Sequence, residues 1–195
     1  MANEYVSAAT LKTTLGITVS TFDTDITTAC SAASRGIDQA CGRRFWADTD
    51  ATSIRYYEAA GPTAVLMIDD LVTLGSLKID ESGGTTFGTT LTVNTDFLLE
   101  PLNAAVETPA RPYTQVRLHP LGSYAWPPYP RSVKVTAKFG WAAVPDEIVR
   151  ATTILATKLF KRQESPFGIV SVGVDEVTAM RIATSDPDVK FLIGP

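Results

Sequence analysis

The clearest pattern in the chain is a helical stripe of apolar residues between positions 22 and 41. These residues return every three or four positions, as on one face of an α-helix: Phe22, Ile26, Ala29, Ala33, Ile37 and Ala40. Asp23 and Asp25 lie at the predicted helix start, where the helix dipole favours negative charge, and Gly42 ends it. Several of its side chains are small, which predicts that another helix can approach it closely.

Two further helices are predicted, one on each side of this pattern. Ser7 and Gly16 indicate the N-cap and the end of a short helix over residues 8–15. A longer helix over residues 145–163 begins with Pro145, whose fixed φ suits a first turn, and ends before Ser165-Pro166. Its apolar residues also form one stripe, so it is expected to pack as a pair with the 22–41 helix.

Between the two long helices the pattern changes to alternation and turn residues. Five strands are predicted there, over residues 53–58, 77–80, 89–93, 114–118 and 132–139. Gly83-Gly84 predicts a hairpin turn after the 77–80 strand. The last strand alternates most regularly, with one face apolar: Val133, Val135, Ala137 and Phe139. The helical pair is therefore interrupted by a β-rich insertion over residues 43–144.

A separate arm follows Pro166. Residues 169–183 have the pattern of a small hairpin or extended arm, and Asp186-Pro187 starts a predicted last short helix. An isolated hairpin is marginal in water, so the arm is expected to pack on its own domain or on another chain. The predicted class is α+β: a helical bundle core with the β-rich insertion, forming one domain over 1–166, and a C-terminal arm over 167–195.

Composition narrows the classes of function. The 195 residues carry 17 basic and 21 acidic side chains, and a net charge of −4 gives the whole chain no electrostatic reason to grip a phosphate backbone. Such a surface still lets DNA slide past without adhering. Because no signal-peptide pattern and no apolar run of about 18 residues occurs, we expect the chain in the cytoplasm at synthesis, without membrane contact.

Candidate catalytic and metal-binding residues are sparse in the sequence. His119 is the only histidine, and no Gly-x-Ser-x-Gly turn accompanies it, so a catalytic triad is not expected. Cys30 and Cys41 lie about 16 Å apart along one predicted helix, too far for a disulfide, and make no zinc site with one distant histidine. Neighbouring carboxylates such as Asp80-Glu81 fit turns and caps. The sequence predicts no enzyme, no metal and no cofactor.

A proline-rich aromatic loop over residues 124–131 contains Trp126 and Tyr129. Its prolines exclude a central strand. We expect its aromatic residues, like Trp141, to be anchors of the core or of an interface. A platform for carbohydrate or peptide is the alternative.

Four parts of the chain, taken together, resemble head-tail connector (adaptor) proteins of long-tailed bacteriophages. The resemblance runs over about residues 5–193 and depends on the order and spacing of these parts. They are Ala32 to Phe45, Thr95 to Ala104, Phe139 to Pro145, and Leu159 to Arg162 with Ser165 to Gly168.

The resemblance implies a structural protein of the virion neck that forms a ring, usually of twelve copies. Such a ring docks beneath the portal protein, offers its other face to a tail or stopper protein, and lets double-stranded DNA pass without specific binding. It also implies assembly in the host cytoplasm and no catalytic residues. Family members without the insertion are essentially helical bundles, so the place of the sheet in the ring stays open.

By this similarity, the C-terminal arm is expected against the portal. The residues expected at the portal or at neighbouring subunits are Phe167, Ile169, Val172, Phe191, Leu192, Trp126 and Tyr129.

Three other interpretations stay open at this point. A neck stopper or tail-terminator subunit also forms rings, although a β-barrel more often dominates those proteins and the two long helices disfavour it. A monomeric carbohydrate- or peptide-binding module would use the loop around Trp126. A small hydrolase would depend on His119.

Overall fold

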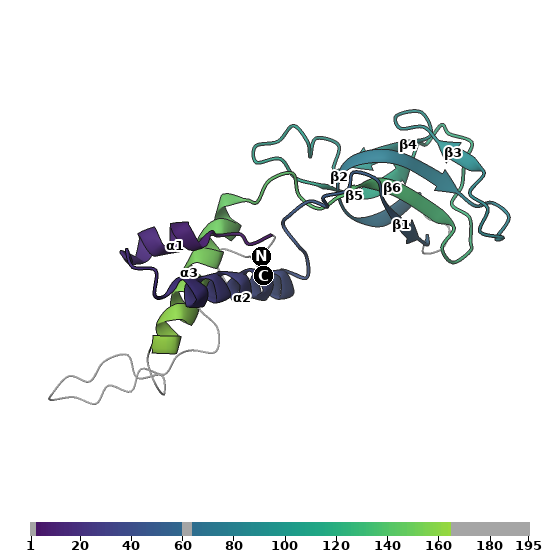
Figure 1. The fold of residues 1–195 in the computed structure, drawn as a ribbon. Coiled ribbons are helices and arrows are strands. Elements are labelled where there is room, and N and C mark those ends of the chain that lie inside the picture. The colour runs from purple at the N-terminus through teal and green to yellow at the C-terminus, as the bar shows by residue number, and fades with distance from the viewer. Residues whose placement is uncertain (1–2, 60–63, 165–195) are drawn as a thin grey trace, which may run out of the picture. The chain divides into compact units, whose positions relative to one another are not determined.

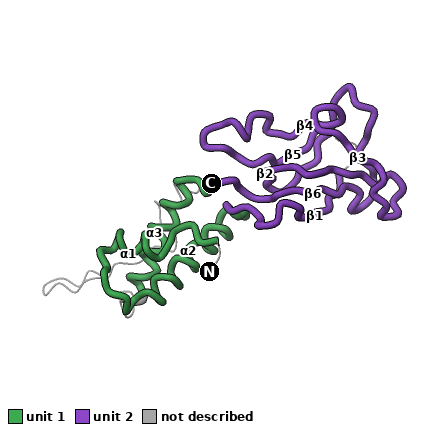
Figure 2. The backbone as a smooth tube through the Cα atoms, turned by 45° about the horizontal axis from the view of Figure 1, so that its top comes forward, with its two compact units in different colours: residues 1–44, 144–195 green, residues 45–143 purple. Residues whose placement is uncertain are grey.

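A computed structural model describes residues 3–59 and 64–164 of the chain (Figure 1). The chain divides into two compact units, one of residues 1–44 and 144–195 and one of residues 45–143 (Figure 2). The described elements are α1 Ala8–Leu15, α2 Asp23–Cys41, β1 Ser53–Tyr57, β2 Val65–Ile79, β3 Thr89–Leu91, β4 Phe97–Glu100, β5 Tyr113–Leu118, β6 Val133–Phe139 and α3 Asp146–Glu164. The predicted α+β class is confirmed. The predicted C-terminal arm lies outside the described residues.

The start of α1 and the C-terminal ends of α1 and α2 follow from their capping residues, as the sequence predicts. Ser7 Oγ accepts a hydrogen bond from the Thr10 N–H at 3.0 Å and so begins α1. Gly16 ends α1 with a φ of 69°, and Gly42 ends α2 with a φ of 62°. Both angles are in the left-handed region, which costs a glycine little because it lacks a Cβ.

The helical unit packs around one apolar cluster, in which α2 contacts both α1 and α3. Gly36 of α2 faces α3 so closely that a Cβ on it would lie 3.4 Å from Leu155 Cδ2. Phe22 and Phe160 meet edge to face with ring centroids 5.9 Å apart. The close helix approach that the small residues predict thus occurs within the chain. The buried members of the cluster are Val6, Leu11, Ile26, Ala29, Cys30, Ala33, Ala156 and Phe160.

The β-rich unit contains one antiparallel sheet with the strand order β1-β6-β2-β5-β4, and β3 also pairs with β2. β2 pairs with β6 over residues 71–79, with β5 over residues 65–71 and with β3 over residues 77–79. Its register shifts on both sides of Leu71 and again between Leu74 and Ser76. Such irregularities bend a strand, which lets one long strand serve two groups of partners.

The alternation pattern misses two parts of this sheet. The predicted 77–80 strand is only the end of β2, which begins at Val65, because the register shifts break the two-residue period. β4 was not predicted, since its Phe-Leu-Leu-Glu sequence does not alternate. The other four strands end within one or two residues of their predicted bounds.

β6 has the predicted alternation, with its apolar side chains fully buried and Lys134, Thr136 and Lys138 half-buried on the opposite face. The apolar face joins a core from all parts of the sheet. Its largest fully buried members are Phe97, Phe139, Leu66, Leu71, Leu77, Ile79, Val116, Val133 and Val135.

Gly140 provides a test of how closely the chain packs after β6. Its φ is 109°, and a Cβ at this position would lie 2.0 Å from the backbone oxygen of Trp46. Gly140→Ala should therefore lower the free energy of unfolding by about 3 kcal/mol or more, through strain and backbone displacement. Urea unfolding measures the change. Gly88→Ala is the matched control, because nothing lies within 4 Å of that position; equal midpoints for the two variants would contradict the close approach.

Candidate functional site

The described residues contain neither a metal site nor an activated thiol. No group of three or more His, Cys, Asp or Glu side chains among them could hold a metal ion. Cys30 and Cys41 are free thiols, as predicted. Burial raises the pKa of both, which disfavours the nucleophilic thiolate. None of the described helices is long and apolar enough to cross a membrane.

His119, the only histidine of the sequence, helps to form a turn. Its Nδ1 accepts a hydrogen bond from the Leu121 N–H at 3.3 Å, and its backbone N–H donates to the Asp96 oxygen at 2.8 Å. These bonds shape the turn that follows β5, and they use the imidazole nitrogen nearest the chain.

Trp126 and Tyr129 of the aromatic loop have different environments. Trp126 is only 8% exposed, belongs to the core of the sheet, and donates from Nε1 to the Ala64 oxygen at 3.2 Å. Tyr129 is 40% exposed and lies over Gly83, where an added Cβ would be 3.3 Å from Tyr129 Cδ1. The other predicted interface residues lie outside the described residues: Phe167, Ile169, Val172, Phe191 and Leu192.

A polar network that the sequence did not reveal connects β1 with β2 across β6. Arg55 Nη1 lies 2.7 Å from Asp69 Oδ2, and the Tyr57 hydroxyl donates to the same oxygen at 2.8 Å. Arg55 also lies 3.6 Å from Asp48 and over the Phe139 ring, 4.1 Å from its centroid. Burial, with the nearby Asp69 carboxylate, raises the pKa of Tyr57 above its ordinary value. The network therefore braces the β1 edge of the sheet.

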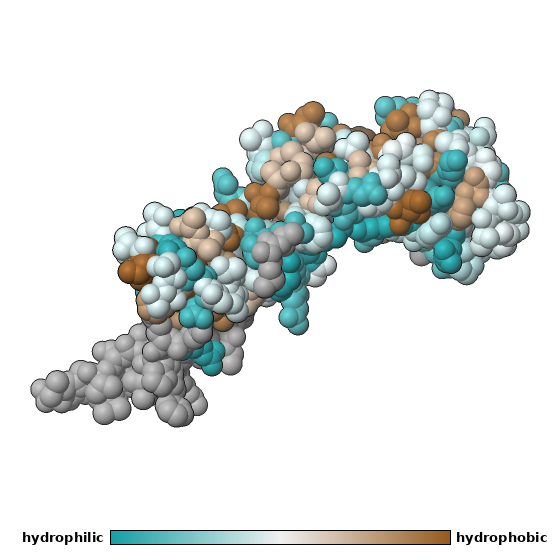
Figure 3. All heavy atoms as spheres, in the orientation of Figure 1, coloured by the Kyte–Doolittle hydropathy of each residue, from teal (hydrophilic) through white to brown (hydrophobic). Residues whose placement is uncertain are grey.

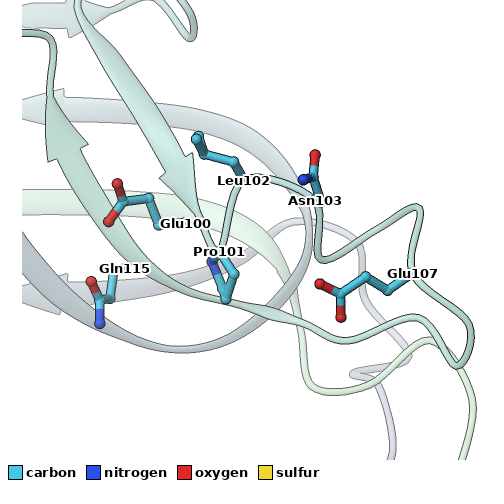
Figure 4. A pocket seen from close by; sticks show the side chains of 6 residues that line it. All are labelled: Glu100, Pro101, Leu102, Asn103, Glu107 and Gln115. Carbon is cyan, nitrogen blue, oxygen red and sulfur yellow. The ribbon is translucent and has the colours of Figure 1, made fainter.

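A shallow depression of about 420 Å³ lies beside the ends of β4 and β5 (Figure 4). Its two carboxylates are already paired: Glu100 binds Arg117 through both oxygens, at 2.7 and 3.1 Å, and Glu107 accepts from Arg111 Nε at 2.6 Å. Figure 4 shows Glu107 on the loop, apart from Glu100 and Gln115 on the strands. The side chains do not converge on one point, so the depression lacks the form of a catalytic site.

Large apolar side chains are exposed at scattered positions, and Figure 3 shows hydrophobic residues in separate small groups on the visible face. Several belong to the loops after β4 and β5, where Val106 is 81% and Leu121 is 88% exposed. Exposed apolar side chains that are scattered singly are common on protein surfaces, so they do not by themselves mark a binding site. The exposed large apolar residues are Val19, Ile54, Tyr56, Met67, Val93, Leu102, Val106, Leu121 and Tyr129.

Comparison with protein families and with curated proteins finds no match for this chain. Solved structures do match, over nearly the whole chain. One is a chain from the neck of an empty GTA particle computed with C6 symmetry, with a TM-score of 0.53, 16% identity, and coverage of 98% of this chain and 89% of that chain. The neck of the native GTA particle with C12 symmetry gives 0.51 and 15%, covering 99% and 92%. A chain of the native gene transfer agent virion gives 0.52 and 18%, covering 99% and 89%.

At these identities the likeness establishes a shared fold. The match extends over most of both chains, so it includes the helices and the β-rich unit together and not one of them alone. No catalytic residue is transferred by it.

Asp80 provides a test of the loop between β2 and β3. Its side chain is 3% exposed; Oδ1 accepts from the Ser82 N–H at 3.0 Å and from Ser82 Oγ at 2.7 Å, and Oδ2 accepts from the Thr85 N–H at 2.6 Å. These hydrogen bonds, that of the Ser82 side chain first, lower the pKa of the Asp80 carboxyl. An Asp two residues before a serine is the sequence signal of such a turn.

Because the folded-state pKa of Asp80 is lowered, its stabilising effect is complete above the unfolded value of about 3.9 and is lost as pH falls through the folded value. Asp80→Asn should lower the free energy of unfolding at neutral pH and flatten its decline below pH of about 4. Urea unfolding at a series of pH values measures both effects. Glu58→Gln, at an exposed position, is the control; the same pH dependence in wild type and Asp80→Asn would refute this role.

Proposed function

We propose that this chain is a structural, non-enzymatic neck protein of a phage-like particle, a ring subunit that joins the portal of the capsid to the tail or stopper. The fold shared with chains of gene transfer agent necks carries the proposal, because it spans at least 98% of this chain and 89% of each neighbour. The connector-like segments of the sequence support the same function independently.

The described surface is compatible with a role in assembly. Its carboxylates near the depression are paired, its histidine shapes a turn, and its exposed apolar side chains are scattered over loops and strands. A ring subunit needs repeated head-to-tail contacts on two different surfaces, which scattered contact residues can supply. A central ligand pocket is not needed for such a function.

The proposed ring has twelve copies. Two of the similar chains come from necks computed with C6 and with C12 symmetry, which supports this number. Since the small-residue face of α2 is occupied by α3 within the chain, contacts between copies use the outward side of α2 and the loops of the sheet. Exposed residues on that side of α2 are Ala32, Arg35, Gln39 and Ala40.

The proposed partners are the portal protein on one face and the tail or stopper protein on the other. Phe167, Ile169, Val172, Phe191 and Leu192 of the C-terminal arm are proposed as portal contacts, with Tyr129 as a contact to a neighbouring subunit. Double-stranded DNA passes through the ring, which assembles in the host cytoplasm and ends in the virion neck. The net charge of −4 gives the chain as a whole no strong attraction for the duplex.

Trp126 bears on the competing interpretation of a carbohydrate- or peptide-binding module. Its ring is buried in the sheet core, so the loop lacks the exposed tryptophan that a stacking platform would use.

A structure of the particle neck in which the chains are traced would separate a connector from a stopper or tail terminator, because each occupies a different level of the neck. A chain of this fold located outside the neck would contradict the proposal.

Portal binding by the arm gives a direct prediction. Deleting residues 167–195 should weaken capture of the portal protein at least tenfold, equal to about 1.4 kcal/mol, because the apolar anchors are lost. The double variant Phe191→Ala and Leu192→Ala should weaken it in the same direction while leaving the chain full length. Leu121→Ser, at an exposed loop position of the other unit, is the matched control and should bind as wild type. Unchanged binding by both arm variants would assign the arm elsewhere.

A further inference from the structure

The cations of the β-rich unit fall into two groups. Three arginines have carboxylate partners: Arg55 with Asp69, Arg111 with Glu107 and Arg117 with Glu100. The other four are Lys78, Arg131, Lys134 and Lys138. Among the described residues, none of these four cations forms an ion pair. Glu58, next to β1, and Glu81, next to β2, are not ion-pair partners of them either.

The four unpaired cations gather on and beside one face of the sheet, called here the cationic face (Lys78, Arg131, Lys134 and Lys138). Lys134 and Lys138 alternate along β6 with the buried apolar residues, so both project from the face opposite the core. Lys78 of β2 is directly opposite Lys134 in the antiparallel register. Lys138 follows Lys134 by four steps along the strand, so the two residues are about 13 Å apart. The cationic face therefore presents a row of positive charge.

This arrangement has a cost within the folded chain. Like charges directly opposite each other on neighbouring strands repel, and here no described carboxylate relieves the repulsion between Lys78 and Lys134. Like charges placed opposite each other, with no carboxylate between them, are expected where a surface serves function. The cationic face thus calls for an anionic partner outside the chain.

Aromatic rings hold two of the cations in place. The Arg131 guanidinium lies over the Tyr56 ring, 4.5 Å from its centroid, and Lys134 Nζ lies 5.8 Å from the centroid of Phe87. The two rings also contact each other, with centroids 5.5 Å apart. Each ring therefore already has a cation and the other ring as partners. The arrangement favours charge contact over base stacking.

From this geometry we propose that the cationic face binds the phosphate backbone of double-stranded DNA, without sequence preference. Three of its four cations are lysines, which are depleted at protein interfaces but serve well as point charges against phosphate. The spacing of about 13 Å along β6 corresponds to about four base-pair steps on a duplex. The acidic remainder of the chain confines the contact to this face. The proposal rests on this face alone and holds or fails separately from the neck function.

Binding of the full-length chain to a short fluorescent duplex of random sequence, measured by anisotropy over a range of salt concentrations, tests the proposal. Each phosphate contact contributes about 0.9 to the slope of log affinity against log salt, so Lys134→Gln with Lys138→Gln should reduce that slope by about 2. An unchanged salt slope in this double variant would overturn the proposal.

The control pair is Arg150→Gln with Lys161→Gln, which removes the same charge from exposed positions of α3. It should leave the salt slope as in wild type; an equal loss in both pairs would overturn the proposal by reducing it to net charge. If poly-glutamate displaces the duplex at an equal concentration of charges, the face binds acidic proteins, and that result would overturn the proposal. Tighter binding of a single strand than of the duplex would also overturn it, because stacking would then dominate.

Discussion

The β-rich unit depends on one strand, β2, because the rest of the sheet pairs with it directly or through one neighbour. Its first half binds β5 and its second half binds β3, while β6 follows it on the other side. A strand that serves so many partners must bend. The register shifts near Leu71 and Gly75 provide the bend, and a Cβ at Gly75 would lie 2.9 Å from the Thr136 oxygen. Only glycine allows that approach.

In the helical unit, the equivalent constraint is the small-residue face of α2. Ala29, Ala33 and Gly36 let α3 come close, and the large rings of Phe22 and Phe160 close the end of the cluster. A methyl or hydrogen at these positions leaves room for a facing helix to pack at short distance. The stability of the pair therefore comes from shape, with few polar contacts in the interior.

The two units share a way of using charge. Carboxylates and arginines are mostly matched locally, as in the Arg55–Asp69 and Arg117–Glu100 pairs, so they fix the sheet and leave little net field. The cationic face is the exception, because it is locally positive although the net charge of the whole chain is −4. Matched pairs would suit the proposed ring of identical copies, because unmatched charge of one sign would repel identical neighbours.

The sequence by itself determined the helices, since caps at Ser7, Gly16 and Gly42 and the apolar period act within a few residues. It also determined the two faces of β6, because the period of a strand is fixed by its backbone. The extent of β2, the existence of β4, and the pairing of Arg55 with Asp69 were decided only by the tertiary structure. Bulges, strand order and cross-strand contacts join residues far apart in the chain, and no local pattern carries that information.

The candidate surfaces were likewise decided by the tertiary structure. Aromatic residues marked the loop in the sequence, but burial separated Trp126 in the core from exposed Tyr129, and register alone brought Lys78 opposite Lys134.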